Sequence, residues 1–179
     1  PAGINPTQKP LTVEAWVQAD RPDGGVLAHG GPAVGYALVL QAGKPQFLVR
    51  TKEEVTVAKS KVETVGRWTH LVGVLSGDKQ VKLYINGKLV DEVQAPSLLP
   101  SEPAQGLEIG ADDAGAVGDY KSPFGFTGMI DEVRVYHAVL SDEEISDHAS
   151  TTDRTPTDDR RLVLACTFEG GTAEDVSGN

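Results

Sequence analysis

Hydrophobic and polar residues alternate along several short runs of the chain, as they do in strands with one buried face. Gly, Pro, Asp and Ser separate these runs, which is typical of turns. The repetition predicts an antiparallel sandwich whose inner faces carry residues such as Val13, Leu83 and Val133. The predicted strand segments are 11–18, 35–41, 45–51, 67–75, 81–93, 106–111, 129–136 and 161–168.

Two local signals are more specific than the alternation. Asn86-Gly87 lies between alternating apolar positions and predicts a tight hairpin, because both residues tolerate the positive φ of a type I′ turn. Ser141 followed by Glu144 forms a capping box and predicts a short helix from about Asp142 to Ala149. We therefore expect one helix near the C-terminus of an otherwise all-β chain.

The segment 128–136 places a carboxylate at an unexpected position. Read as a strand, the segment alternates, and Asp131 shares a face with Met129, Val133 and Val135. A buried unpaired charge is costly, so Asp131 should have hydrogen-bond donors, a cation or a water-lined edge. We expect the carboxylate either to accept from turn N–H groups or to contact a structural cation.

Composition restricts the class of protein. A chain of 179 residues suits one domain, and its net charge of −10 argues against nucleic acid or an anionic membrane as a partner. The single cysteine, Cys166, allows no internal disulfide and is expected to be a buried thiol. No apolar run approaches the roughly 20 residues of a membrane span. Both ends are expected to continue in a longer protein.

Five motifs in a fixed order extend from Leu11 to about Ala149: "LTVEAWVQAD", "GYALVLQAGKPQFLV", "GRWTHLVGVLSGDKQVKLYINGKLV", "GLEIGAD" and "FTGMIDEVRVYHAVLSDEEI". Together they resemble a laminin-G-like jelly roll of the concanavalin A-like lectin/glucanase superfamily, of the type appended to secreted bacterial hydrolases such as sulfatases. The resemblance implies an antiparallel two-sheet β-sandwich and a secreted, periplasmic or cell-surface location.

The domain organisation follows from this resemblance. Residues 1–150 form the predicted jelly roll, and 151–160, which lack apolar periodicity, form a predicted linker. Residues 161–179 resemble the segment that normally opens such a module. They are expected to fold back as an extra strand that completes this sandwich; the alternative is that they begin a second, truncated module.

No catalytic residues are predicted. Glucanases of this superfamily share a Glu-x-Asp-x-x-Glu motif on one strand, which supplies paired carboxylates, and the chain lacks it. The four histidines show no metal-ligand spacing, and the common hydrolase and nucleotide-binding motifs are absent from the sequence.

Sugar binding needs an aromatic platform with a few directional polar groups. Aromatic residues make up only 6% of the chain, and both Trp16 and Trp68 are expected to be packing residues. The long loop 110–126 is the most function-like segment, because long loops on rigid scaffolds commonly carry binding residues. The ligand-binding candidates are Tyr36, Arg50, Asp119 and Tyr120.

The acidic side chains of this loop and of the strand after it suggest a structural calcium ion, which prefers carboxylate and carbonyl oxygens. The candidate ligands are Asp112, Asp113 and Asp131; the alternative is a solvated acidic loop. A second cluster is basic and spans one hairpin, where the lysines either bind an anion or only aid solubility. Its members are Lys44, Arg50, Lys52, Lys59 and Lys61.

These observations predict a non-catalytic, carbohydrate-binding or surface-binding accessory module of a secreted hydrolase. The alternative is a structural interaction domain that packs against its own parent enzyme and binds no glycan. The expected partners are therefore carbohydrate and the parent hydrolase domain, without nucleic acid and without membrane insertion.

Overall fold

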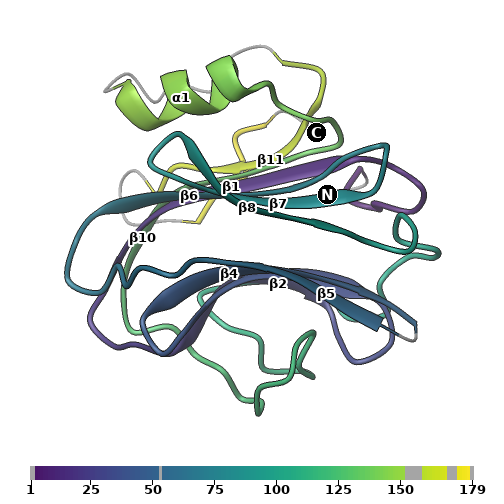
Figure 1. The fold of residues 1–179 in the computed structure, drawn as a ribbon, viewed down its shortest axis with the longest axis horizontal. Coiled ribbons are helices and arrows are strands. Elements are labelled where there is room, and N and C mark those ends of the chain that lie inside the picture. Colours follow the sequence, from purple (N-terminus) through teal and green to yellow (C-terminus); the bar gives the residue numbers. More distant parts are fainter. Residues whose placement is uncertain (1–2, 53, 152–158, 169–172, 178–179) are drawn as a thin grey trace.

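Two antiparallel sheets stack face to face in the computed structural model, which describes residues 3–52, 54–151, 159–168 and 173–177 (Figure 1). The six-stranded sheet has the order β11-β10-β1-β6-β7-β8, and the five-stranded sheet has the order β5-β4-β3-β2-β9. The predicted all-β sandwich is confirmed. The strands of the first sheet are β1 (Leu11–Ala19), β6 (Thr69–Leu75), β7 (Gln80–Ile85), β8 (Lys88–Gln94), β10 (Gly128–Tyr136) and β11 (Leu162–Cys166); those of the second are β2 (Gly24–Gly30), β3 (Gly35–Gln41), β4 (Lys44–Thr51), β5 (Glu54–Lys59) and β9 (Leu107–Ile109).

The main core lies between the sheets, as the alternation predicts. Val13, Leu83 and Val133 are each fully buried there. Burying a side chain of this size stabilises the fold by about 1.5–3 kcal/mol. The core is tight enough that Gly73 of β6 has no room for a Cβ atom, which would lie 2.2 Å from the ring of Phe47.

The strands β2 and β5 were not predicted. Every residue of β2 is buried, so its sequence does not alternate. Its inner side contacts the core, whereas Ala28 on its outer side packs with Val117 from the loop 110–126. In Figure 1 this loop lies beneath the five-stranded sheet. β5 is an edge strand with charged residues at both ends, Glu54 and Lys59.

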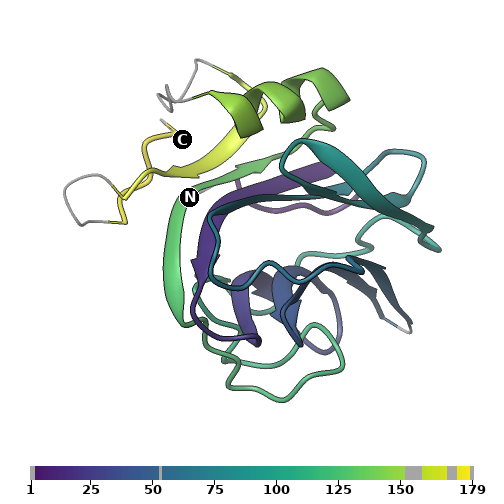
Figure 2. The same cartoon turned by 60° about the vertical axis from the view of Figure 1, so that its left-hand side comes forward.

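The helix α1 (Asp142–Ser150) covers the outer face of the six-stranded sheet in both views of the fold (Figures 1 and 2). It has the predicted capping box, in which Ser141 and Glu144 satisfy each other's backbone N–H groups. Its buried residue Ile145 packs with Leu140 and Tyr136 in a second hydrophobic cluster. The predicted hairpin is also confirmed: Asn86 and Gly87 connect β7 to β8, with φ of 50° and 77°.

The prediction that Asp131 shares a face with Val133 and Val135 was wrong, because β10 contains a bulge. Glu14 of β1 pairs with Arg134, but Trp16 pairs with Asp131, so β10 has one extra residue between these pairs. Glu132 has a φ of 53° at this point. Val133 therefore still faces the core, whereas Asp131 lies opposite Trp16 on the outer face, where its Oδ1 accepts from the Glu132 N–H at 2.9 Å.

The C-terminal segment supplies an edge strand to this module. β11 pairs antiparallel with β10, and Cys166 is buried, as expected. This is the arrangement expected if residues 161–179 fold back onto the sandwich. Most of the predicted linker, 152–158, lies outside the described residues, and the division of the chain into domains stays a prediction.

Candidate functional site

A surface groove of about 450 Å³ lies between the segment 60–68, which joins β5 to β6, and the β7–β8 hairpin. Its size is within the range of small-molecule sites in proteins, about 300–1,000 Å³. We call it the Trp68 groove. Its lining includes Lys61, Val62, Arg67, Trp68, Asn86 and Lys88.

The indole of Trp68 is the most distinctive part of this groove. All ten aromatic residues lie in the described part of the chain, and Trp68 is the only one that is exposed, at 44%. Val62 and Val90, also exposed, line the same groove and add to its apolar surface. An exposed indole flanked by apolar side chains offers a flat surface to a planar or ring-shaped ligand.

The prediction that Trp68 packs in the core was wrong. The prediction assumes that the alternation of β6 includes Trp68, but β6 begins only at Thr69. Trp68 belongs to the preceding turn segment, where the inside–outside rule of the strand no longer applies.

Backbone hydrogen bonds fix the segment that carries Trp68. The N–H groups of Ser60, Thr64 and Gly66 donate to the carbonyls of Pro45, Gly43 and Ala19 at 2.8–2.9 Å. Gly66 adopts a φ of 78°, which a glycine accepts without strain. Because these bonds tie the segment to the β3–β4 hairpin and to the end of β1, the Trp68 groove is preorganised for a ligand.

The other wall is the turn of the β7–β8 hairpin. The Oδ1 atom of Asn86 accepts from the His70 N–H at 2.9 Å, and the Asn86 N–H donates to the His70 carbonyl at 2.9 Å. Within the described residues the Asn86 Nδ2 group has no hydrogen-bond partner. It is therefore a donor available to a ligand in the groove, together with the side chains of Lys61, Arg67 and Lys88.

The loop 110–126 is organised around Asp112, which is almost fully buried. Its carboxylate accepts from the Val117 N–H and the Tyr120 hydroxyl, and its carbonyl accepts from Ser122. Burial raises the pKa of Asp112 above its ordinary value, although these hydrogen bonds oppose the rise. Tyr120 also stacks on Phe124 at 4.3 Å between ring centroids. Asp112 thus holds the loop together.

The four predicted ligand-binding residues are not brought to one place. Arg50 donates to the Val117 carbonyl and lies 3.7 Å from the carboxylate of Asp119, which is exposed beside Tyr120. Tyr36 lies on the other face of that sheet, fully buried in the core, with its hydroxyl 3.3 Å from Nδ1 of His29. This burial removes Tyr36 from any surface that a ligand contacts, whereas Arg50, Asp119 and Tyr120 stay predictions.

The three predicted calcium ligands do not form a site either. Asp112 is turned into the loop, Asp113 is exposed, and Asp131 lies on β10 opposite Trp16. In the part of the chain that the structure describes, no three His, Cys, Asp or Glu side chains gather in a way that could hold a metal ion. These residues do not fit the calcium ion that the sequence suggested, and we derive no role for it.

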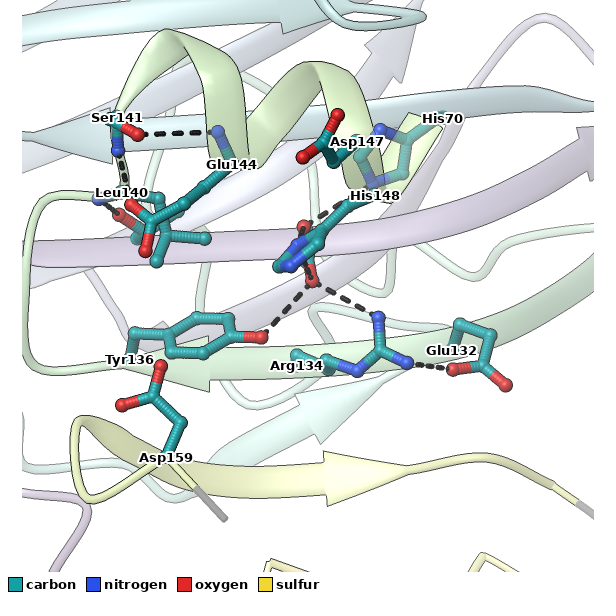
Figure 3. Close-up of polar contacts among 12 residues, drawn as sticks. His70, Glu132, Arg134, Tyr136, Leu140, Ser141, Glu144, Asp147, His148 and Asp159 are labelled. Atoms are coloured by element: carbon teal, nitrogen blue, oxygen red, sulfur yellow. Dashed lines mark hydrogen bonds and ion pairs between the residues drawn. The ribbon is translucent and has the colours of Figure 1, made fainter. Parts of the chain in front are cut away.

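A buried polar cluster lies between α1 and the six-stranded sheet (Figure 3). Its centre is the fully buried carboxylate of Glu14, with Nδ1 of His148 at 3.1 Å, Nε2 of His70 at 3.3 Å and a guanidinium nitrogen of Arg134 at 3.2 Å. The Tyr136 hydroxyl lies 3.4 Å away. Figure 3 shows Arg134, Tyr136 and His148 directed toward the same point. We call these five residues the Glu14 cluster.

Charge complementarity sets the protonation of this cluster. Burial opposes the ionisation of Glu14, but its hydrogen bonds to His148 and His70 outweigh burial, and its pKa lies well below the ordinary value. The hydrogen bond to Glu14 raises the pKa of His148. Glu14 is inaccessible to solvent, and its negative charge is balanced by the surrounding side chains of the cluster. The cluster therefore fastens the helix to the sheet rather than contacting a ligand. Glu14 lies 134 positions from His148, so no local sequence signal reveals the cluster.

The family model described as "Concanavalin A-like lectin/glucanases superfamily", Laminin_G_3, matches residues 2–146. The chain belongs to this family. Its members share the jelly-roll fold that the two sheets form here, and the family resemblance inferred from the five sequence motifs is confirmed.

Among curated proteins, mouse (Mus musculus) pentraxin-related protein PTX3 is 33% identical over 102 residues, which cover 55% of this chain and 27% of the relative. The chain thus spans about a quarter of the length of the curated relative it matches. A proposed carbohydrate binding protein from Bacteroides ovatus has a similar structure, with a TM-score of 0.71 and 19% identity over 99% of this chain and 52% of its own. The CBM40 of the Ruminococcus gnavus IT-sialidase has a TM-score of 0.66 and 17% identity, covering 82% and 85% of the two chains.

These structural likenesses establish the fold. Within the described residues, no helix has both the length and the apolar character that crossing a membrane requires.

Proposed function

We propose that this chain is a non-catalytic carbohydrate-binding module and that the Trp68 groove is its binding site. The observation that carries the proposal is the exposure of Trp68, the one exposed aromatic ring among the described residues, in a preorganised groove. Membership in a lectin-like family and the likeness to the sialidase CBM40 support a sugar as the ligand.

The chemistry of the groove suits a pyranose ring. One face of such a ring is apolar and stacks on an indole, while its edges carry hydroxyls that need directional partners. The Nδ2 group of Asn86 and the ammonium groups of Lys61 and Lys88 are donors on the walls around Trp68. Stacking would supply most of the affinity, and the donors would select the orientation of the ring.

The proposal also assigns a setting. The module would act outside the cytoplasm, at the cell surface or after secretion, and would hold an attached hydrolase near its substrate. The likeness to a module of a sialidase supports this arrangement. The association with sulfatases stays a prediction from the sequence.

A glycan array probed with the parent chain and with Trp68→Ala tests the proposal. Val139→Ala is the matched control, because Val139 is exposed to a similar extent, 42%, and lies beyond the C-terminal end of β10. We expect the parent and the control to bind the same glycans and Trp68→Ala to lose them.

Unchanged binding by Trp68→Ala would place the sugar site elsewhere, with the loop around Tyr120 as the next candidate. Absence of binding to every glycan would overturn the proposal and favour the structural interaction domain, in which Val62, Trp68 and Val90 contact a protein partner instead.

A further inference from the structure

A second groove, of about 640 Å³, continues from the Trp68 groove along the edge of the sandwich. It lies against the β3–β4 turn and the end of β5, and we call it the Lys44 groove. The two grooves share Ser60, Lys61 and Val90, so they meet at Lys61. A ligand longer than one sugar ring could therefore occupy both.

The charge of the two grooves is opposite to that of the whole chain. The protein has 26 acidic and 16 basic residues, yet five basic residues and only one acidic residue, Asp91, line these grooves. The carboxylate of Asp91 accepts one backbone hydrogen bond, from the N–H of Lys59 at 2.8 Å, and its single negative charge is outnumbered by the five cations. The five basic residues are Lys44, Lys59, Lys61, Arg67 and Lys88.

These five cations are not neutralised by the protein itself. Within the described residues, none of them lies within 4 Å of a carboxylate oxygen as an ion pair. Other cations of the chain do have such partners, including Lys82 with Glu92 and Arg161 with Glu144. The Arg67 guanidinium donates to a backbone carbonyl, that of Glu63, at 2.7 Å. The grooves therefore present a net positive charge next to an aromatic platform.

The structure also explains which members of the predicted basic cluster belong together. Lys44, Lys59 and Lys61 line the grooves, whereas Arg50 lies toward the other end of the β4–β5 hairpin and turns to the loop 110–126. The groups that join the lysines are Arg67 and Lys88, from segments that are distant in sequence.

We infer that the ligand of these joined grooves is an acidic oligosaccharide, in which one ring stacks on Trp68 and carboxylate or sulfate groups lie along the lysines. The inference rests on the proposed function of the Trp68 groove. Ammonium and guanidinium groups form charge-assisted hydrogen bonds with such oxyanions, and these are roughly twice as strong as neutral ones. A neutral glycan would leave the lysines unpaired.

Calorimetric titration of the full chain at low salt tests this inference with three polysaccharide probes: dextran, dextran sulfate and polygalacturonate. The variant Lys61→Gln/Lys88→Gln removes two groove charges. The matched control Lys79→Gln/Lys121→Gln removes two charges from exposed positions in the β6–β7 turn and the loop 110–126. We expect the acidic probes to bind the parent at least about tenfold more tightly than dextran, and the groove variant to lose most of that advantage while the control keeps it.

Preference for the sulfated or the uronate probe identifies which oxyanion the lysines select. Equal affinity for dextran and both acidic probes, with Trp68→Ala still inactive, would overturn the inference and leave the proposed function intact. Equal losses in the groove variant and the control, or equally tight binding of a DNA oligonucleotide that does not depend on Trp68, would also overturn it, because either result indicates general charge attraction.

Discussion

The substitution Glu14→Gln removes the charge at the centre of the Glu14 cluster and keeps the size of the side chain. The carboxylate is fully buried and contacts His148, His70 and Arg134 at 3.1–3.3 Å. Removing one partner of a buried ion pair costs about 3–5 kcal/mol, because the other charge stays buried. Arg134 keeps Glu132 as a partner, so we expect a loss near the lower limit, about 3 kcal/mol.

Thermal unfolding followed by circular dichroism at pH 7 measures this loss. For a chain of this length, 1 kcal/mol shifts Tm by roughly 2–4 °C, so Glu14→Gln should lower Tm by roughly 6–12 °C. The control is Glu92→Gln, which breaks the exposed pair with Lys82. Such surface pairs contribute about 0–1 kcal/mol. A Tm of Glu14→Gln within 2 °C of the control would show that the cluster does not stabilise the fold as argued.

Four further outcomes are expected. Since the pKa of His148 is raised in the folded state, the stabilisation that protonated His148 gives the fold is complete below pH 6.5 and is lost as the pH rises through the folded-state pKa. The urea midpoints of the parent and of His148→Gln should therefore converge at alkaline pH, and a difference that stays constant with pH would contradict this. Asp112→Ala leaves the buried Val117 N–H and the half-buried Tyr120 hydroxyl without their acceptor and should cost about 2–4 kcal/mol, with faster hydrogen exchange confined to the loop 110–126. Gly73→Ala forces a methyl group against Phe47 and should destabilise by about 1–3 kcal/mol in urea titrations, whereas a neutral effect would mean that the ring moves freely. Asp131→Ala removes the acceptor of the bulge N–H and should lower Tm by a few degrees, for a loss of about 1–3 kcal/mol; an unchanged Tm would refute this role.

Local rules were sufficient for much of the fold. The alternation in β1, β7 and β10 placed Val13, Leu83 and Val133 in the core, since period-two patterns depend only on which face excludes water. The rules failed where tertiary contacts decide. β2 is buried on both faces, by the core on its inner side and by the distant loop 110–126 on its outer side, so its residues do not alternate. The bulge at Glu132 moves the β10 residues before it to the opposite face.

The candidate site was harder to predict than the fold. Trp68 lies one residue before β6 begins, where strand periodicity no longer indicates burial. The Trp68 groove also combines segments up to thirty positions apart, from Ser60 to Val90, and the adjoining Lys44 groove adds Lys44 from a third segment. The basic residues of one hairpin were visible in the sequence, but only the fold shows which of them face the groove and that Arg67 and Lys88 join them.

The two indole N–H groups provide the most direct test of the central claim, because the chain has only two tryptophans. In a ¹⁵N–¹H correlation spectrum of the parent chain, Trp68→Phe assigns the two indole signals. Titration with a glycan that binds on the array should shift the Trp68 signal in a saturable way and leave that of Trp16 in place. Saturable binding with the Trp68 signal unmoved would contradict the assignment of this groove as the binding site.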